Sequence, residues 1–254
     1  MTLPELTITF PARDRAWVLP HTLKALEAQT YPAEKLAFRF IAHNCTDSTY
    51  ELLQEWCATH DLLYRYCQVE RVTDDTPMDG RTSRERDRSA RDPRHAQGRL
   101  KNKLKSGLDR REWWGFLDSD VLLHPDAFRL MAQARKDIVG GLTNVTPADY
   151  AGECLWNYFP ANPRPGMPFR RIPGSPVPAS LERVGLVAGI LLYSPLAVRH
   201  CSFDFIGVGE DEGAIRDAEQ FNLGVYLEPR ARGVHVMARE HLEAAVKEWE
   251  AWQR

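Results

Sequence analysis

Two aspartates that follow a short apolar run are the residues of this sequence best placed to do chemistry. Trp114 to Leu117 is typical of a buried strand, and Asp118 and Asp120 come directly after it. In extended backbone, side chains two residues apart face the same side of the chain. Buried carboxylates need a partner or a metal, and paired oxygen ligands suit Mg²⁺ or Mn²⁺, which in turn suits a diphosphate. The alternative is an ordinary turn after a strand, because Asp and Ser are common in turns.

The elements that would hold this pair alternate between strands and helices. The apolar spacing predicts strands at 6–10, 36–42, 62–72, 114–117, 137–144, 184–193, 224–227 and 233–236, and helices at 18–29, 50–60, 99–108, 125–136, 207–221 and 239–254. Strands and helices in this order form parallel strands with right-handed crossovers. We therefore expect an α/β fold: a single domain over residues 1–237 with a mixed, mostly parallel sheet flanked by helices. An amphipathic helix within 238–254 is expected to pack on it.

The polar residues that follow the predicted strands are expected to lie close together. Ligands of such sheets bind beyond the carboxyl ends of the strands. Arg13, Arg15, Asn44, Asp118 and Asp120 each follow a predicted strand, so all five should lie on that edge. This convergence is more informative than any single motif.

Two segments lack a regular apolar pattern. Residues 74–98 are polar and rich in arginine, which predicts a mobile loop. Such a loop could be an electropositive flap that meets a diphosphate or an anionic acceptor, or only a solvated surface. Residues 157–180 are crowded with Pro and Gly, and an irregular segment of this length is usually a lid or binding loop. We expect the second segment to shape the acceptor pocket.

Composition limits the classes of protein to which the chain can belong. The 254 residues carry a net charge of −2 and five cysteines, none of them in a CxxC pair. That argues against a disulfide framework or a structural zinc site and fits a reducing compartment. The N-terminus has no signal-peptide pattern, and no stretch has the apolar length of a membrane span. We therefore expect a cytoplasmic protein with no transmembrane segment, while peripheral membrane contact and the oligomeric state stay open.

The motifs together resemble the GT-A class of nucleotide-sugar glycosyltransferases, closest to the family-2-type enzymes. The matching motifs are Thr9–Arg15 for the first strand and nucleotide loop, Asn44–Thr49 for the turn after the second strand, Lys101–Asn102 on the helix before the metal motif, Phe116–Asp120 for the Asp-x-Asp motif, Gly209–Asp211 for a late Glu-Asp pair, and Gly224–His235 for the closing strands. The order and spacing of the set are more specific than the short Asp-x-Asp motif alone. The resemblance implies a GT-A, Rossmann-like domain.

The same resemblance implies a function and a set of roles. It implies metal-dependent transfer of a sugar from a UDP- or GDP-linked donor to an acceptor hydroxyl, with inversion at the anomeric carbon. Mn²⁺ or Mg²⁺ would be bound by Asp118, Asp120 and His235, and Asp211 or Glu210 would be the general base. The implied donor-binding residues are Pro11, Ala12, Arg13, Arg15, Asn44, Arg99, Lys101, Asp118, Ser119 and Gly189.

Several of these roles have plainer alternatives. Acids at a helix start are favoured by the helix dipole without any catalysis, and His235 could be a core histidine. Arg13 and Arg15 could pair with nearby acids. His43-Asn44 replaces the acidic residues that often contact the nucleotide base in this family, so a preference for uridine or guanosine stays open. Retaining relatives also use a metal-bound His, so the stereochemistry stays open too.

The sequence also bears on two other classes of protein. A nucleotidyltransferase would need glycines after the first strand to cradle a triphosphate, and residues 11–15 have none. The remaining alternative is a non-catalytic nucleotide-sugar-binding or nucleic-acid-interacting protein, against which the two intact acid pairs argue. The sequence does not identify the sugar or the acceptor, which could be a glycan, a lipid phosphate or modified DNA.

Overall fold

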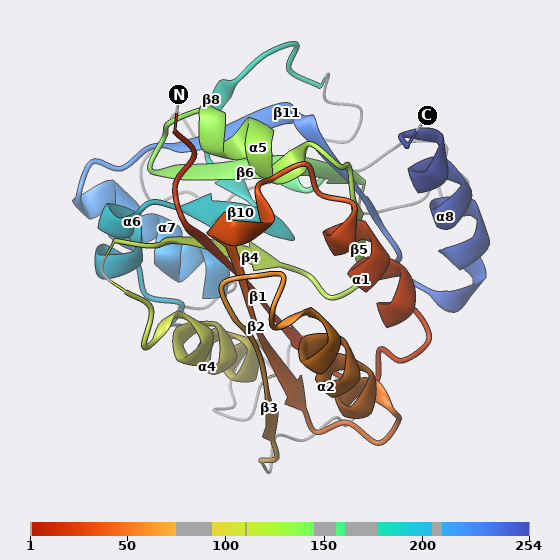
Figure 1. The fold of residues 1–254 in the computed structure, drawn as a ribbon. Coiled ribbons are helices and arrows are strands. Elements are labelled where there is room, and N and C mark those ends of the chain that lie inside the picture. Colours follow the sequence, from red (N-terminus) through yellow and green to blue (C-terminus); the bar gives the residue numbers. More distant parts are fainter. Residues whose placement is uncertain are drawn as a thin grey trace.

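Strands and helices alternate along most of the chain (Figure 1). The computed structural model describes residues 2–74, 93–109, 111–144, 156–160, 177–204 and 210–253. The helices are α1 (Leu19–Glu27), α2 (Thr49–His60), α4 (Pro93–Lys105), α5 (Ala127–Gln133), α6 (Pro195–His200), α7 (Glu210–Gln220) and α8 (Leu242–Ala251), with short 3-10 turns η1 (Ala33–Lys35) and η3 (Arg239–His241). The strands are β1 (Leu6–Ala12), β2 (Leu36–His43), β3 (Cys67–Val72), β4 (Trp113–Leu117), β5 (Val121–Leu123), β6 (Ile138–Asn144), β7 (Tyr158–Phe159), β8 (Glu182–Val184), β9 (Leu186–Val187), β10 (Ile190–Tyr193) and β11 (Val225–His235).

The main sheet of the described residues is mixed and mostly parallel, as the sequence predicts. Its order is β3-β2-β1-β4-β10-β6-β11-β5, with β8 also paired to β11. β1 is parallel to β2 and β4, and β6 is parallel to β11. β10 runs antiparallel between β4 and β6, while β5 and β8 run antiparallel to β11. The carboxyl ends of β1, β4 and β11 therefore meet the start of β10 at one edge of the sheet.

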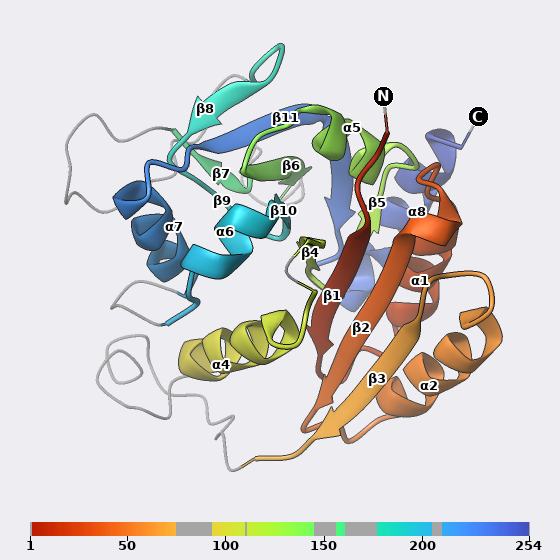
Figure 2. The same cartoon turned by 60° about the vertical axis from the view of Figure 1, so that its left-hand side comes forward.

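Helices cover both faces of this sheet (Figure 2). Leu6, Ile8 and Phe10 of β1 point to one face and form a buried core with side chains of α1, α2 and α5. On the other face, α6 and α7 pack over β4, β6 and β10 in a second core. The alternation of the β1 side chains thus places apolar groups in the first core, while Thr9 faces the other way and accepts a hydrogen bond from Trp114 Nε1 at 2.8 Å.

The predicted strand over 184–193 is wrong as a single element. The structure divides this run into β8, β9 and β10. Gly185 separates the first two, and Gly189 adopts φ +82° between the last two. Positive φ is disfavoured for residues with a Cβ and easy for glycine, so the chain can turn at this point. The last of the three strands then runs antiparallel between its neighbours and brings Gly189 to the end of β4.

Conversely, the two strands predicted at 224–227 and 233–236 are one element. β11 continues through Pro229, and its register with β6 shifts between Glu228 and Arg232. A bulge accommodates a proline that cannot donate to the ladder. Buried Glu228 supports the bulge by accepting hydrogen bonds from the backbone N–H and the guanidinium of Arg230.

Two predicted boundaries are also corrected. The strand predicted from residue 62 begins only at Cys67, because the chain turns after α2 and Tyr64 packs back against Trp56 and Phe38. The helix predicted over 99–108 is α4, which begins at Pro93 and ends before Gly107 at φ +79°. Proline fits the first helical turn, and glycine in this conformation ends a helix. Most of the arginine-rich segment, 75–92, and residues 161–176 of the Pro-rich segment lie outside the described residues.

The C-terminal helix packs against the end of the sheet beside α1. Trp249 of α8 is buried and donates a hydrogen bond from Nε1 to the Leu123 carbonyl at 2.7 Å. Val18, Ala25 and Val236 belong to the same small core. None of the helices in the described ranges combines the length and apolar character that a membrane crossing requires.

Candidate active site

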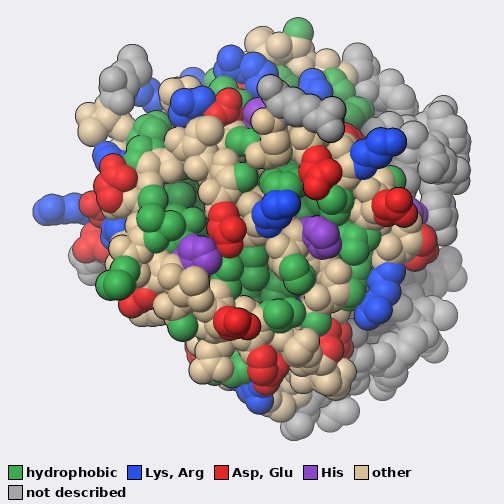
Figure 3. Space-filling model, turned by 45° about the vertical axis from the view of Figure 1, so that its right-hand side comes forward, with side chains coloured by type: hydrophobic (Ala, Val, Ile, Leu, Met, Phe, Trp, Pro, Cys, Tyr) green, Lys and Arg blue, Asp and Glu red, His purple; other side chains and the backbone are tan. Residues whose placement is uncertain are grey.

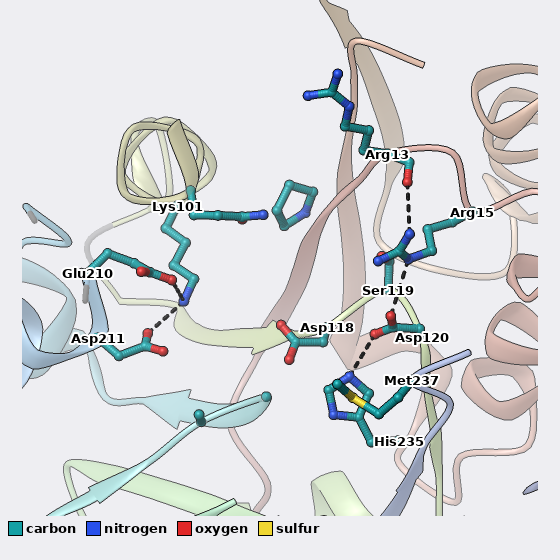
Figure 4. A pocket seen from close by; sticks show the side chains of 14 residues that line it. Arg13, Arg15, Lys101, Asp118, Ser119, Asp120, Glu210, Asp211, His235 and Met237 are labelled. Atoms are coloured by element: carbon teal, nitrogen blue, oxygen red, sulfur yellow. Dashed lines mark hydrogen bonds and ion pairs between the residues drawn. The ribbon is translucent and has the colours of Figure 1, made fainter. Parts of the chain in front are cut away.

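A pocket of about 360 Å³ lies at the edge where β1, β4 and β11 end and β10 begins. Most of the side chains that line it are polar or charged (Figure 4). The lining residues are Pro11, Arg13, Arg15, Gln97, Lys101, Asp118, Ser119, Asp120, Ala188, Gly189, Glu210, Asp211, His235 and Met237. The topology of the sheet thus brings together residues that are up to 226 positions apart in the sequence.

Asp120 is held between Arg15 and His235 on one side of the pocket. Its Oδ2 accepts a hydrogen bond from Arg15 Nε at 3.2 Å, and its Oδ1 from His235 Nε2 at 3.1 Å. Burial alone would raise the pKa of Asp120, but the hydrogen bond with His235 and the charge of Arg15 outweigh it and hold that pKa below its ordinary value. The pKa of His235 is raised, because the Asp120 and Asp118 carboxylates outweigh the opposite effect of burial. Asp120 is therefore ionised at neutral pH.

Asp118 lies between this group and the carboxylates of α7 (Figure 4). No described side chain donates a hydrogen bond to its carboxylate, and burial, together with nearby Asp120, raises its pKa. Its backbone N–H donates to the Gly189 carbonyl at 2.8 Å. A Cβ placed on Gly189 would lie 3.1 Å from Asp118 Oδ2, so only glycine fits this turn without displacing the carboxylate. The structure thus presents a half-buried acid whose carboxylate receives no hydrogen bond from the described side chains.

Lys101 and two acids form the opposite side of the pocket. Lys101 Nζ lies 3.0 Å from Glu210 Oε1 and 2.6 Å from Asp211 Oδ1. Burial raises the pKa of Asp211 to about 6, although Lys101 acts in the opposite direction. Burial would lower the pKa of Lys101, but Asp211 and Glu210 outweigh it and raise that pKa. The lysine is therefore charged, and Asp211 titrates close to neutrality.

The loops after β1 and β2 are hydrogen-bonded to each other. Asp14 Oδ1 accepts from the Thr46 backbone N–H at 2.7 Å, and Asp47 Oδ2 accepts from the Ala16 N–H at 3.0 Å. Thr49 Oγ1 accepts from the Arg15 N–H at 2.7 Å. These bonds fix the backbone from which the Arg15 side chain reaches Asp120. Asp14 and Asp47 therefore have a structural role in the loop that carries Arg15.

Ligand-type side chains meet closely at a different place from the predicted metal site. Asp14, Cys45 and Asp47 have ligand atoms that all lie within 4.8 Å of one another, and they are the only such group among the described residues. Oxygens of both acids already accept backbone hydrogen bonds, so hydrogen bonding accounts for this cluster. Asp118, Asp120 and His235 line one pocket, but their ligand atoms are less closely grouped.

Three of the predicted donor-binding residues do not line the pocket. Ala12 is buried at the end of β1. Asn44 adopts φ +48° and bonds through its side chain to Asp74, which ties the ends of β2 and β3 together. The largely exposed guanidinium of Arg99 lies 3.6 Å from an oxygen of the same aspartate. Their roles in donor binding stay predictions.

Conversely, the pocket includes three residues that the sequence analysis did not select. Gln97 lies four positions before Lys101 on α4, and Met237 lies two positions after His235, so helical and extended spacing place each beside a selected residue. Ala188 precedes Gly189. Periodicity applied outward from the selected residues would have found Gln97 and Met237, and Ala188 is the chain neighbour of a selected residue.

The described surface residues do not gather into a broad basic face in the view of Figure 3. Acidic and basic side chains there are interspersed around a hydrophobic centre. A nucleic-acid-binding surface typically gathers Lys and Arg on one face or along a helix. The described residues of this face therefore lend no support to the nucleic-acid alternative.

The sequence matches one family model over more than half of its length. Residues 3–154 match the model described as glycosyltransferase family 25, N-terminal domain. The chain belongs to this glycosyltransferase family. The predictions of a glycosyltransferase and of a GT-A fold are thus confirmed, with a matched model that is described by the family number 25. No curated protein sequence is similar enough to this family member to count as a match.

Solved glycosyltransferase structures share its fold. The mannosyltransferase PcManGT from Pyrobaculum calidifontis, in complex with GDP-Man and Mn²⁺, superposes with a TM-score of 0.60 at 12% identity, covering 99% of this chain and 61% of that chain. GalNAc-T7 with UDP, GalNAc and Mn²⁺ gives 0.60 at 14% identity, covering 92% and 44%. Residues 1–349 of S. aureus TarS with UDP-GlcNAc give 0.55 at 12% identity, covering 95% and 61%. The chain thus spans less than two thirds of each of these structures, and at such identities the likeness establishes the fold alone.

Proposed function

We propose that this chain is a metal-dependent glycosyltransferase that moves a sugar from a nucleoside-diphosphate sugar to an acceptor hydroxyl with inversion. The observation that carries the proposal is a single pocket that contains two pairs of acidic residues, each pair beside a different basic side chain. Asp118 and Asp120 lie beside His235, and Glu210 and Asp211 lie beside Lys101. Pairs of carboxylates whose environments separate their protonation behaviour are typical of acid–base sites.

The first acid group suits a divalent cation. Its donor set is two carboxylates and an imidazole, and one carboxylate, Asp118, receives no hydrogen bond from any described side chain. Carboxylate oxygens are the ligands that Mg²⁺ and Mn²⁺ prefer. We infer that Asp118, Asp120 and His235 hold this ion. When bound, it would stabilise the negative charge on the nucleoside diphosphate as that group leaves.

Cationic side chains on the same side suit the diphosphate itself. Arg13 and Arg15 line the pocket, and Arg15 is already oriented by Asp120 and by the Arg13 carbonyl. Guanidinium groups bind phosphate oxygens with charge-assisted, directional hydrogen bonds. We assign the donor to the region of Pro11, Arg13, Arg15, Ser119 and Gly189. Both UDP- and GDP-linked donors are proposed, because the structurally similar enzymes were solved with either.

The second acid group suits a general base. Asp211 carries an upward-shifted pKa of about 6, which makes it a stronger base than an ordinary aspartate while it remains largely ionised at pH 7. In the proposed step, its carboxylate takes the proton of the acceptor hydroxyl. The acceptor oxygen bonds to the anomeric carbon from one face as the bond to the diphosphate oxygen breaks on the other. One such displacement inverts the configuration.

Ligand-dependent stability tests this proposal. A ligand at 100 times its Kd stabilises the folded state by about 2.7 kcal/mol, which raises the Tm of a domain of this size by about 5–10 °C. We expect such a shift with UDP or GDP in Mn²⁺, and its loss in chelator and in Asp120→Ala. The control is Glu248→Ala, which changes an exposed acid of α8 that does not line the pocket. No shift with either nucleotide in the native chain would reject the proposal.

A further inference from the structure

The ammonium group of Lys101 forms ion pairs with carboxylates of the protein itself. An ammonium has three N–H donors. Two of them are directed at Glu210 and Asp211, at 3.0 and 2.6 Å, and the group also lies 4.2 Å from the centre of the Phe116 ring. Only 4% of the side chain is exposed. In this arrangement the lysine has little capacity left to bind a diphosphate.

The backbone around Lys101 holds it at this place. One turn earlier on α4, Gly98 lies so close to the Phe203 carbonyl that a Cβ there would be 2.1 Å from the oxygen and 3.2 Å from Glu210 Cβ. Asn102 Oδ1 accepts a hydrogen bond from the Phe203 N–H at 3.0 Å, and its Nδ2 donates to Asp204 Oδ1. Close contact at Gly98 therefore sets the distance between α4 and the start of α7, and it directs Lys101 toward the acids.

We propose that Lys101 is a positioning residue for the catalytic base, which holds the Asp211 carboxylate in place and keeps it ionised, rather than a ligand of the donor phosphates. This inference rests on the proposed function. It assigns Lys101 to the acceptor-activating half of the reaction and leaves the diphosphate to the arginines of the β1–α1 loop.

The charges around Asp211 explain why such a cation is needed. Lys101 of α4, Glu210 of α7 and Asp118 after β4 all act on the pKa of Asp211. Tyr193 of β10 also faces it, but burial raises the pKa of Tyr193 far enough that it stays neutral. Burial and two acids therefore favour protonated Asp211, and Lys101 is the cation among these neighbours that opposes them. Without it a larger fraction of the Asp211 carboxylate would be protonated at neutral pH, and that fraction could not accept a proton.

The pH profile of donor hydrolysis tests the assignment. The measured reaction is transfer of the sugar to water, followed as released nucleoside diphosphate from UDP-glucose and GDP-mannose in Mg²⁺ between pH 5 and 9. Loss of an opposite charge in contact moves a pKa by about 1–3 units. For Lys101→Met we therefore expect the acidic limb of the kcat profile to move up by about 1–3 pH units, a rate at pH 7 about 2–100-fold lower that recovers toward pH 9, and an unchanged donor KM.

Two variants serve as comparisons. Lys101→Arg keeps the charge and should keep the limb near its native position. Lys103→Met removes an exposed lysine of the same helix that pairs with Glu70 on the surface, and it should change neither the limb nor KM. Should Lys101→Met fail to fold, Glu210→Gln provides the test: removing one acid neighbour should move the limb down, and an unmoved limb would overturn the proposal.

The outcomes separate this inference from the proposed function. A raised donor KM in Lys101→Met with an unmoved limb would make the lysine a donor ligand and overturn the inference, leaving the function intact. A native chain that neither hydrolyses a donor nor is stabilised by a nucleotide with metal would instead overturn the proposed function.

Discussion

Substitution of Gly189 by alanine tests the arrangement around Asp118 in two measurable ways. The residue adopts φ +82°, and a Cβ there would lie 3.1 Å from Asp118 Oδ2. The left-handed backbone costs alanine about 1–2 kcal/mol, which lowers the Tm by about 2–8 °C. The added methyl group also forces the carboxylate to shift by a few tenths of an ångström. Changes to the groups that surround and orient metal ligands typically weaken metal affinity about 10–100-fold.

A matched control separates the two effects. Gly107 adopts φ +79°, but the nearest atom to a Cβ there is Arg39 Nη1 at 3.8 Å, and neither residue lines the pocket. Gly107→Ala should therefore lower the Tm to a similar extent and leave metal binding unchanged. The assay is titration of Mn²⁺ at saturating UDP or GDP, read by Tm and by calorimetry. Equal Mn²⁺ affinities in Gly189→Ala and in the native chain would refute the role given to Asp118.

Two further predictions concern the residues that support the pocket. Asn157 is buried and bonds to the Gly141 and Ala188 carbonyls and the Thr143 N–H, so Asn157→Ala leaves several buried backbone groups unpaired and should cost at least about 3 kcal/mol in urea unfolding; a loss under 1 kcal/mol would contradict this. Asp47→Ala removes hydrogen bonds to the Thr49 and Ala16 backbone and should cost about 2 kcal/mol at pH 7. Burial alone would raise the pKa of Asp47, but those hydrogen bonds outweigh it and hold the folded-state pKa below the unfolded value. The stabilisation by Asp47 is therefore present above about pH 4 and disappears as the pH falls through the folded-state pKa. A difference in stability between the native chain and Asp47→Ala that does not shrink in acid would count against this reasoning.

Local patterns predicted the first two strands and the first two helices well. β1, β2, α1 and α2 appear within two residues of their predicted bounds, because alternation and helical spacing are strong in these segments. The run at 184–193 was misjudged, since its apolar residues are continuous and nothing local shows that Gly189 takes a positive φ. Pro229 had the opposite effect, because a bulge supported by Glu228 lets the strand continue.

The sequence predicted the side of the pocket around Asp118 and Asp120 more fully than the side around Lys101. Positions after strand ends placed Arg15, Asp118 and Asp120 together, because parallel topology requires their convergence. The contact of Lys101 with acids more than 100 positions away depends on how Gly98 packs against Phe203, and no sequence spacing encodes that. Asn44 was selected by its motif, yet its side chain bonds to Asp74, a tertiary contact that the sequence does not show.

The configuration of the released sugar tests the central claim most directly. UDP-glucose or GDP-mannose, both α-linked, is incubated with the protein in Mg²⁺, and the anomeric proton of the product is followed by NMR before mutarotation. The account predicts nucleoside diphosphate release with the β-anomer formed first, and loss of this release in Asp211→Asn and in chelator. First formation of the α-anomer, or release that is unchanged in Asp211→Asn, would contradict a single displacement assisted by Asp211.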